Sequence, residues 1–103
     1  MIKVEDILNA TNGGLDIILE LYPQAKACID GSKKHFAIRN EKTPSAALRK
    51  YNSKSYGEIW QVTDFGGDGR GENAVTLYMR ENNIDRSHFN EAILQLAAKY
   101  GVR

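Results

Sequence analysis

Residues 33–63, with the sequence KKHFAIRNEKTPSAALRKYNSKSYGEIWQVT, decide the fold class of this chain. Within this stretch, three segments alternate apolar and polar residues with the two-residue period of half-buried strands: 34–39, 46–51 and 56–63. Turn-forming residues separate the three segments, and Pro44 removes a backbone donor from the first turn. The pattern predicts an antiparallel meander of three strands.

Apolar residues with helical spacing precede this stretch. Residues 4–8 predict a short helix that stops at Thr11-Asn12-Gly13-Gly14, because glycines suit the end of a helix and the turn after it. Residues 14–22 predict a second helix, which Pro23 closes because proline cannot continue a helix.

Two more helices are expected after the strands. The glycine-rich segment 66–71 is interpreted as a loop that leads into a helix over residues 72–82. The apolar spacing within residues 87–100 predicts the last helix, with Ser87 as its N-cap and Gly101 as its stop. The predicted fold class is α+β, with a small antiparallel sheet and helices at both ends of one domain, residues 1–103.

Length and composition narrow the class of protein. A chain of 103 residues has room for one modest core, which excludes a two-domain enzyme. One cysteine and two histidines exclude an internal disulfide and a structural zinc site with four Cys or His ligands. No apolar run approaches the roughly 20 residues of a membrane span, and the N-terminus lacks a secretory signal pattern. We therefore expect a soluble, cytoplasmic protein.

Charge is distributed unevenly along the chain. Residues 26–54 contain eight Lys or Arg and two Asp or Glu, although the whole chain carries a net charge of only +1. A basic segment with tyrosines interspersed is typical of proteins that follow a phosphate backbone and stack on bases. The structural alternative is a solvated pair of strands whose lysines prevent aggregation.

The nucleic-acid hypothesis assigns roles to particular side chains. We expect Trp60 to belong to the core, because it shares a strand face with Val62. Tyr51 and Tyr56 are the candidates for base stacking. The candidates for phosphate contact are Lys33, Lys34, Lys42, Arg49, Lys50, Lys54 and Arg70.

Several short motifs carry no catalytic assignment. Asp64-Phe65-Gly66 matches a protein-kinase tripeptide, but the chain is too short for a kinase and lacks the other kinase motifs. The segment 64–75 resembles an EF-hand loop, yet its twelfth position is Val75 where a glutamate is needed. The glycines of 66–71 either contact a phosphate or only turn the chain.

The remaining reactive side chains show no catalytic spacing. Cys28 is expected to be a small buried hydrophobic residue, and His35 and His88 are expected at the surface. No carboxylates are spaced as an acid and base pair. We therefore expect no enzymatic activity and no cofactor.

Three segments together resemble the N-terminal zinc-binding domain of bacterial DNA primases. These segments are Phe36-Ala37-Ile38-Arg39-Asn40-Glu41-Lys42-Thr43-Pro44-Ser45, Glu58-Ile59-Trp60-Gln61-Val62-Thr63-Asp64-Phe65-Gly66 and Gly71-Glu72-Asn73-Ala74-Val75. The resemblance continues to Lys99-Tyr100-Gly101-Val102 and so covers nearly the whole chain. The loop around Gly69-Arg70 is longer than in that family.

The resemblance places the four metal-ligand positions of that family at Phe36, Arg39, Val62 and Phe65. None of these residues is a zinc ligand, so the metal is not expected here. Phe36, Val62 and Phe65 are expected to fill the former metal site with apolar volume. Arg39 is expected to pair with Asp64 in place of the metal bridge.

The chain also resembles zinc-free variants of this domain that accompany toprim-containing, primase-like proteins of mobile elements. The resemblance implies a non-catalytic module that recognises single-stranded template DNA beside a separate primase, helicase or toprim protein, with no membrane partner. The alternative is a protein-interaction module that docks on a replication or transposition partner. An exposed apolar patch, or basic residues spread over separate faces, favours that alternative.

Overall fold

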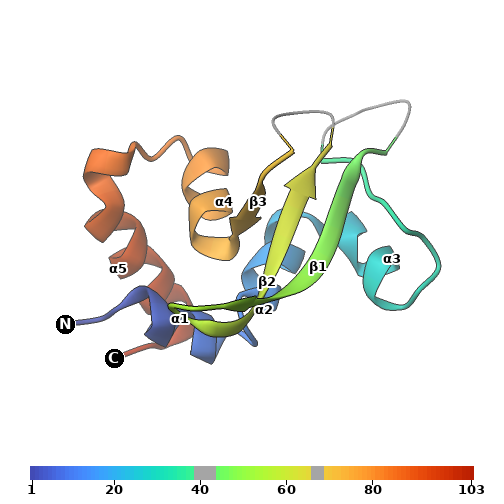
Figure 1. Cartoon of the computed structure of the whole chain (residues 1–103). Coiled ribbons are helices and arrows are strands. Elements are labelled where there is room, and N and C mark those ends of the chain that lie inside the picture. The colour runs from blue at the N-terminus through green and yellow to red at the C-terminus, as the bar shows by residue number, and fades with distance from the viewer. Residues whose placement is uncertain (39–43, 66–68) are drawn as a thin grey trace.

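The computed structural model describes residues 1–38, 44–65 and 69–103, and these residues form an α+β fold (Figure 1). The three strands form one antiparallel sheet in the order β1-β2-β3. The elements are α1 (Val4–Ala10), α2 (Leu15–Leu21), a 3-10 turn (Pro23–Ala25), α3 (Lys26–Ile29), β1 (Ala46–Ser53), β2 (Gly57–Asp64), β3 (Gly71–Asn73), α4 (Ala74–Glu81), a second 3-10 turn (Arg86–His88) and α5 (Phe89–Tyr100). None of the helices in these described ranges has the length and apolar character needed to span a bilayer.

The expected helices are present, and α3 and the two 3-10 turns are additional. The prediction that Ser87 caps the last helix is wrong. Ser87 instead donates its backbone N–H to the Asp85 carboxylate (3.1 Å), so a 3-10 turn comes first and α5 begins at Phe89. Gly101 does end α5, in the left-handed conformation that suits a glycine.

The sheet differs from the predicted meander at one strand. Two of the expected strands are confirmed as β1 and β2, which pair along their whole length from Ala46↔Asp64 to Ser53↔Gly57. The described part of segment 34–39 forms only an isolated bridge, Phe36↔Ala46. Phe36 is buried there, whereas Lys34 and His35 are solvent-exposed. The third strand is β3, in a stretch that was expected to be a loop and the start of a helix.

Two consecutive glycines between α1 and α2 bring the N-terminal helices against the rest of the fold. Gly13 accepts a hydrogen bond from the Trp60 N–H (2.9 Å), which lies beyond the part of β2 that pairs with β3. A Cβ on Gly13 would come within 3.3 Å of the β2 backbone, and a Cβ on Gly14 would lie 2.7 Å from Ala74 Cβ. Both glycines have positive φ, 71° and 91°, which L side chains rarely adopt. The α1–α2 turn therefore contacts β2 and α4 as bare backbone.

The core lies between the sheet and the helices and draws on nearly every element. Phe36 packs against Tyr22 with the two ring centroids 5.9 Å apart. The buried Thr11 hydroxyl donates to the Ile7 carbonyl (2.8 Å), so this polar side chain is satisfied within α1. The largest fully buried apolar side chains are Ile7, Leu8, Ile17, Ile18, Val62, Val75, Leu77 and Leu96.

The close approach at Gly14 predicts a large loss of stability in Gly14→Ala. The new Cβ overlaps Ala74 Cβ and also imposes left-handed strain, so we expect the free energy of unfolding to fall by about 3 kcal/mol. The matched control is Gly31→Ala, where φ is also positive but nothing lies within 4 Å of the new Cβ. Its expected loss is about 1 kcal/mol. Urea denaturation of both variants measures the difference, and equal losses would contradict the packing role of Gly14.

Candidate nucleic-acid interface

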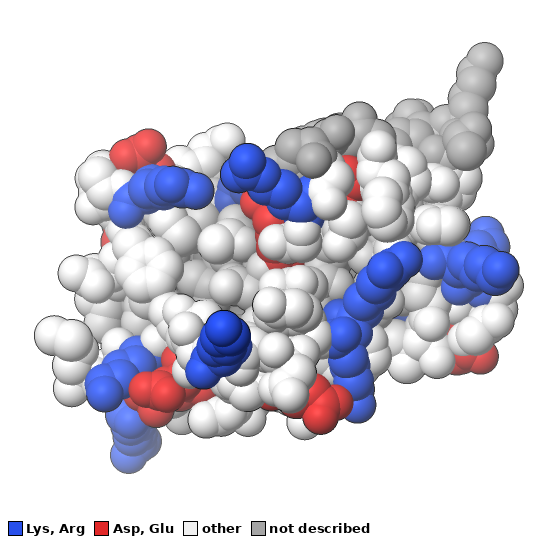
Figure 2. All heavy atoms as spheres, in the orientation of Figure 1, with Lys and Arg blue, Asp and Glu red and all other residues white. Residues whose placement is uncertain are grey.

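The structure separates the predicted phosphate contacts into several locations. Lys33 and Lys34 are exposed on the segment after α3, and Lys54 is exposed in the β1–β2 turn. Arg70 lies just before β3, and Lys42 lies outside the described residues. On the face of the molecule shown in Figure 2, Lys and Arg side chains form several separate groups with uncharged surface between them. The basic segment of the sequence is therefore not a continuous basic patch on this face.

The strand register assigns the neighbouring basic residues of β1 to opposite faces of the sheet. Arg49 is paired with Gln61, whereas Lys50 is paired with Trp60. Residues directly opposite each other in an antiparallel pair project to the same face, and successive residues alternate. Arg49 and Tyr51 consequently share one face of β1, and Lys50 lies on the other.

Arg49 lies beside an exposed aromatic ring. Its guanidinium carbon is 5.7 Å from the ring centroid of Phe65, which directly follows β2. The Phe65 ring also makes an edge contact with His35, with centroids 6.1 Å apart. Phe65 is 51% exposed, and Arg49 is exposed as well. Tyr51, which is 50% exposed, lies on the same face of β1 as Arg49, two residues further along the strand. We call Arg49, Tyr51 and Phe65 the stacking surface.

The opposite face of the sheet offers a weaker site. Lys50 Nζ lies 5.4 Å from the Trp60 ring centroid and 3.2 Å from the Glu58 carboxylate. Trp60 is partly buried against the core, as expected, and Tyr56 also packs partly buried against the core. Because Glu58 neutralises Lys50 locally, this face attracts a phosphate less than the stacking surface does.

The positions aligned with the metal ligands of primases have different environments. Phe36 and Val62 are buried in the core, as predicted. The prediction that Phe65 fills the same apolar volume is wrong, because Phe65 is exposed and contacts Arg49, which lies on the sheet face opposite Val62. Arg39 lies outside the described residues, so its predicted pair with Asp64 is not described. The Asp64 carboxylate accepts a hydrogen bond from the Ser45 hydroxyl (3.2 Å).

The structure also shows where the cysteine and the two histidines lie. Cys28 is partly buried against the core, and this burial raises the pKa of its thiol. His35 and His88 are exposed, as expected. Within the described ranges, no three His, Cys, Asp or Glu side chains group in a way that would hold a metal ion.

Arg70 lines a hollow of about 420 Å³ beside the edge strand β3. Gln61 reaches this hollow by passing over Gly71, where a Cβ would lie only 2.5 Å from the Gln61 amide oxygen. The hollow is lined by Gln61, Arg70, Gly71, Glu72, Asn73, Thr76, Met79, Arg80, Ile84 and Arg86. We call it the β3-edge hollow.

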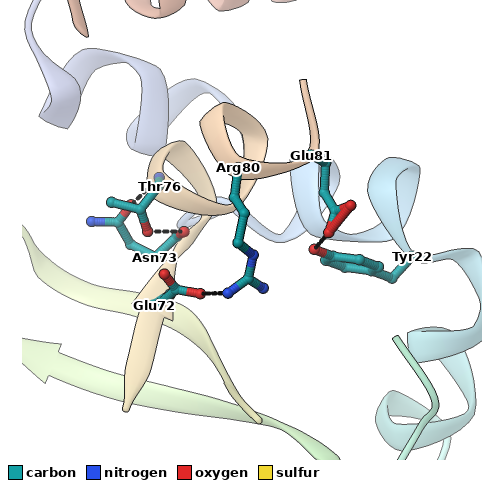
Figure 3. A network of polar contacts seen from close by, with 6 residues as sticks. All are labelled: Tyr22, Glu72, Asn73, Thr76, Arg80 and Glu81. Carbon is teal, nitrogen blue, oxygen red and sulfur yellow. Dashed lines mark hydrogen bonds and ion pairs between the residues drawn. The ribbon is translucent and has the colours of Figure 1, made fainter. Parts of the chain in front are cut away.

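A polar network holds one wall of the β3-edge hollow in place (Figure 3). Arg80 on α4 forms an ion pair with Glu72 on β3 at 2.5 Å. The Tyr22 hydroxyl donates to the Glu81 carboxylate (2.5 Å), and this bond connects the end of α2 to α4. Burial and the hydrogen bond to Glu81 together raise the pKa of Tyr22 to about 12. The Asn73 side chain caps α4 by accepting from the Thr76 N–H (3.0 Å).

Comparisons with models of protein families, with curated proteins and with solved structures found no match to this chain. The resemblance to the zinc-binding domain of primases therefore rests on the quoted residues alone and stays a prediction. The functions of the stacking surface and of the β3-edge hollow are therefore inferred from their geometry.

Sequence reasoning missed the exposed role of Phe65 and, in the β3-edge hollow, Gln61, Met79, Arg80, Ile84 and Arg86. Phe65 follows the predicted strand 56–63, so no alternation pattern placed its side chain. Nothing in the sequence placed Arg80 and Arg86 near Arg70, because three separate segments meet at the β3-edge hollow.

The raised pKa of Tyr22 predicts a specific alkaline loss of stability. The folded state keeps the Tyr22 proton up to about pH 12, whereas the unfolded chain loses it near pH 10. The contribution to the free energy of unfolding is therefore complete below pH 10 and is lost as the pH rises to about 12. We expect Tyr22→Phe to be about 1 kcal/mol less stable than the wild type at pH 8, and this difference should shrink above pH 10.

Urea denaturation across this pH range measures the difference. The control Tyr51→Phe changes an exposed hydroxyl and should leave the free energy of unfolding unchanged. A wild-type advantage that stays constant up to pH 12 would contradict the assigned role of the Tyr22 proton.

Proposed function

We propose that this protein is a non-catalytic module that binds single-stranded DNA through the stacking surface. The observation that carries the proposal is the exposed Phe65 ring with the Arg49 guanidinium 5.7 Å from its centroid. Exposed aromatic rings and guanidinium planes stack on bases, and a base of a single strand is free to leave its neighbours and stack in this way. A duplex keeps its bases stacked on each other and offers no such face.

Charge near the stacking surface supports the same function. His35 contacts the Phe65 ring, and the exposed Lys33 and Lys34 directly precede it in sequence. Cations beside a stacking surface hold the phosphates on either side of the stacked base. Lys50, by contrast, lies on the opposite sheet face beside Glu58, so the proposal does not include it as a phosphate contact. Tyr56 packs against the core, so the proposal does not include it as a base-stacking residue.

Docking on another protein is the second candidate function, and one observation favours it. The basic residues of β1 are divided between two faces, and α5 exposes Phe89 (38%) and Leu94 (63%). Exposed apolar side chains on a helix are typical of protein contacts. This candidate predicts that α5, and not Phe65, determines binding to a partner.

Replacing the exposed ring tests the proposed function. We expect Phe65→Ala to weaken binding to an oligothymidylate by about 10-fold, because one base stack is worth roughly 1–3 kcal/mol. Fluorescence anisotropy with a labelled oligonucleotide measures the affinity. The control Phe89→Ala removes another exposed phenylalanine on α5 and should leave the affinity unchanged. Equal effects of the two variants, or no binding by the wild type at low salt, would reject the proposal.

The salt dependence of binding tests the cationic part of the interface. A lysine that neutralises one phosphate of a single strand contributes about −0.7 to the slope of log K against log[salt]. We expect Lys34→Gln to make the slope less steep by about 0.7 and Lys26→Gln, an exposed lysine on α3, to leave it unchanged. Anisotropy titrations at several salt concentrations give both slopes, and the same slope in all three proteins would exclude Lys34 from the interface.

A further inference from the structure

Three arginines line the β3-edge hollow, and the stacking surface does not account for them. They are Arg70, Arg80 and Arg86, and Glu72 is the acidic side chain among the described lining residues. The three arginines come from the segment before β3, from α4 and from the second 3-10 turn, so tertiary folding gathers them. The neighbouring hollow lined by Asn82, Asn83, Ile84, Asp85, His88, Glu91 and Gln95 contains two acidic residues and no Lys or Arg. The positive lining therefore belongs to this hollow and is not a general property of the surface.

One arginine of the hollow is held in a fixed position. Arg80 is bound to Glu72 at 2.5 Å, and Figure 3 shows its guanidinium directed between Glu72 and Tyr22. Tyr22 is a second hydrogen-bond partner of this guanidinium, so Arg80 is fixed from two sides. A guanidinium has five N–H donors in one plane, and those that Glu72 and Tyr22 do not use remain for an anion. Such a pre-positioned group costs little entropy when it binds an anion.

The remaining walls of the hollow suit the uncharged part of a ligand. Met79 and Ile84 present apolar surface, and the amide of Gln61 can both donate and accept. The Gln61 side chain lies over Gly71, where the absence of a Cβ leaves room for it. A volume of about 420 Å³ lies within the range of small-molecule sites and exceeds what a phosphate group alone would fill.

We propose that the β3-edge hollow binds a nucleoside phosphate, with the phosphate on the three arginines and the nucleoside against Met79, Ile84 and Gln61. The planar guanidinium of arginine can donate two parallel hydrogen bonds to the oxygens of a phosphate. The apolar side chains and the amide of the other walls suit contacts with a sugar and a base. The ligand has two possible sources with this shared chemistry, a free nucleotide and the 5′-phosphorylated end of a DNA strand. Only the strand end depends on the proposed function, because a free nucleotide needs no stacking surface.

The test measures binding of defined probes to the full chain. The probes are 5′-dTMP, thymidine, inorganic phosphate, and a short oligothymidylate with either a 5′-phosphate or a 5′-hydroxyl. Calorimetry gives the affinities, and amide chemical shifts of Gly71, Asn73 and Thr76 report whether the hollow is the site. We expect 5′-dTMP to shift these amides and to bind more tightly than inorganic phosphate, and thymidine to bind much more weakly.

A matched pair of variants assigns the effect to the hollow. Arg86→Gln is expected to weaken 5′-dTMP binding by about 10-fold, because it removes one phosphate donor. Arg103→Gln removes the same charge from an exposed residue outside the hollow and should leave the affinity unchanged. Retained amide-shift dispersion shows that both variants are folded. Phe65→Ala should not change 5′-dTMP affinity, so failure of the stacking surface and failure of the hollow are told apart.

Each outcome supports or overturns the proposal. Tighter binding of the 5′-phosphorylated strand than of the 5′-hydroxyl strand, lost in Arg86→Gln, identifies a strand end as the ligand. Binding of 5′-dTMP without any such difference between the strands identifies a free nucleotide. Equal affinity for 5′-dTMP and inorganic phosphate, unchanged amide shifts, or equal weakening in Arg86→Gln and Arg103→Gln overturns the assignment.

Discussion

The contact of the Gly13-Gly14 turn with β2 and α4 is the constraint on which the arrangement of this molecule depends. A backbone without side chains is the only structure that fits, since an added Cβ at Gly14 would lie 2.7 Å from Ala74 Cβ. The hydrogen bond from the Trp60 N–H to the Gly13 carbonyl satisfies a β2 donor that no strand covers. This turn thereby joins the N-terminal helix pair to the sheet and to α4, and the Tyr22–Glu81 hydrogen bond makes a further connection between α2 and α4.

This arrangement helps to explain how the three strands stay together although the sequence has a single cysteine and so no internal disulfide. Phe36 packs on Tyr22, and Val62 is buried at the centre of β2, so apolar contacts occupy two positions where the resemblance to primases expects metal ligands. Phe65 is the exception. It lies on the opposite face and is exposed, which makes it available for a ligand instead of for the core. The residue that carries the proposed function thus lies at a position where the resemblance expects a metal ligand.

The two proposed sites use the sheet in different ways. The stacking surface uses the face of β1 and β2 on which Arg49 projects, whereas the β3-edge hollow uses the outer edge of the sheet and α4. Gln61 connects them, because it is paired with Arg49 on one side and with Asn73 on the other. This row of cross-strand neighbours makes the two proposed sites adjacent across β2.

Local pattern determined the α+β class, the two long strands and most helix ends. Alternation and helical spacing act over a few residues, and Pro23 and Gly101 mark helix ends through their own backbone preferences. The sequence also identified Arg49, Tyr51 and Arg70 as exposed candidates. Only the tertiary structure decided that β3 replaces the expected strand at 34–39, since strand pairing depends on which distant segment reaches an open edge. It also gathered Arg80 and Arg86 around Arg70, because a hollow formed by separate segments has no period or spacing in the sequence.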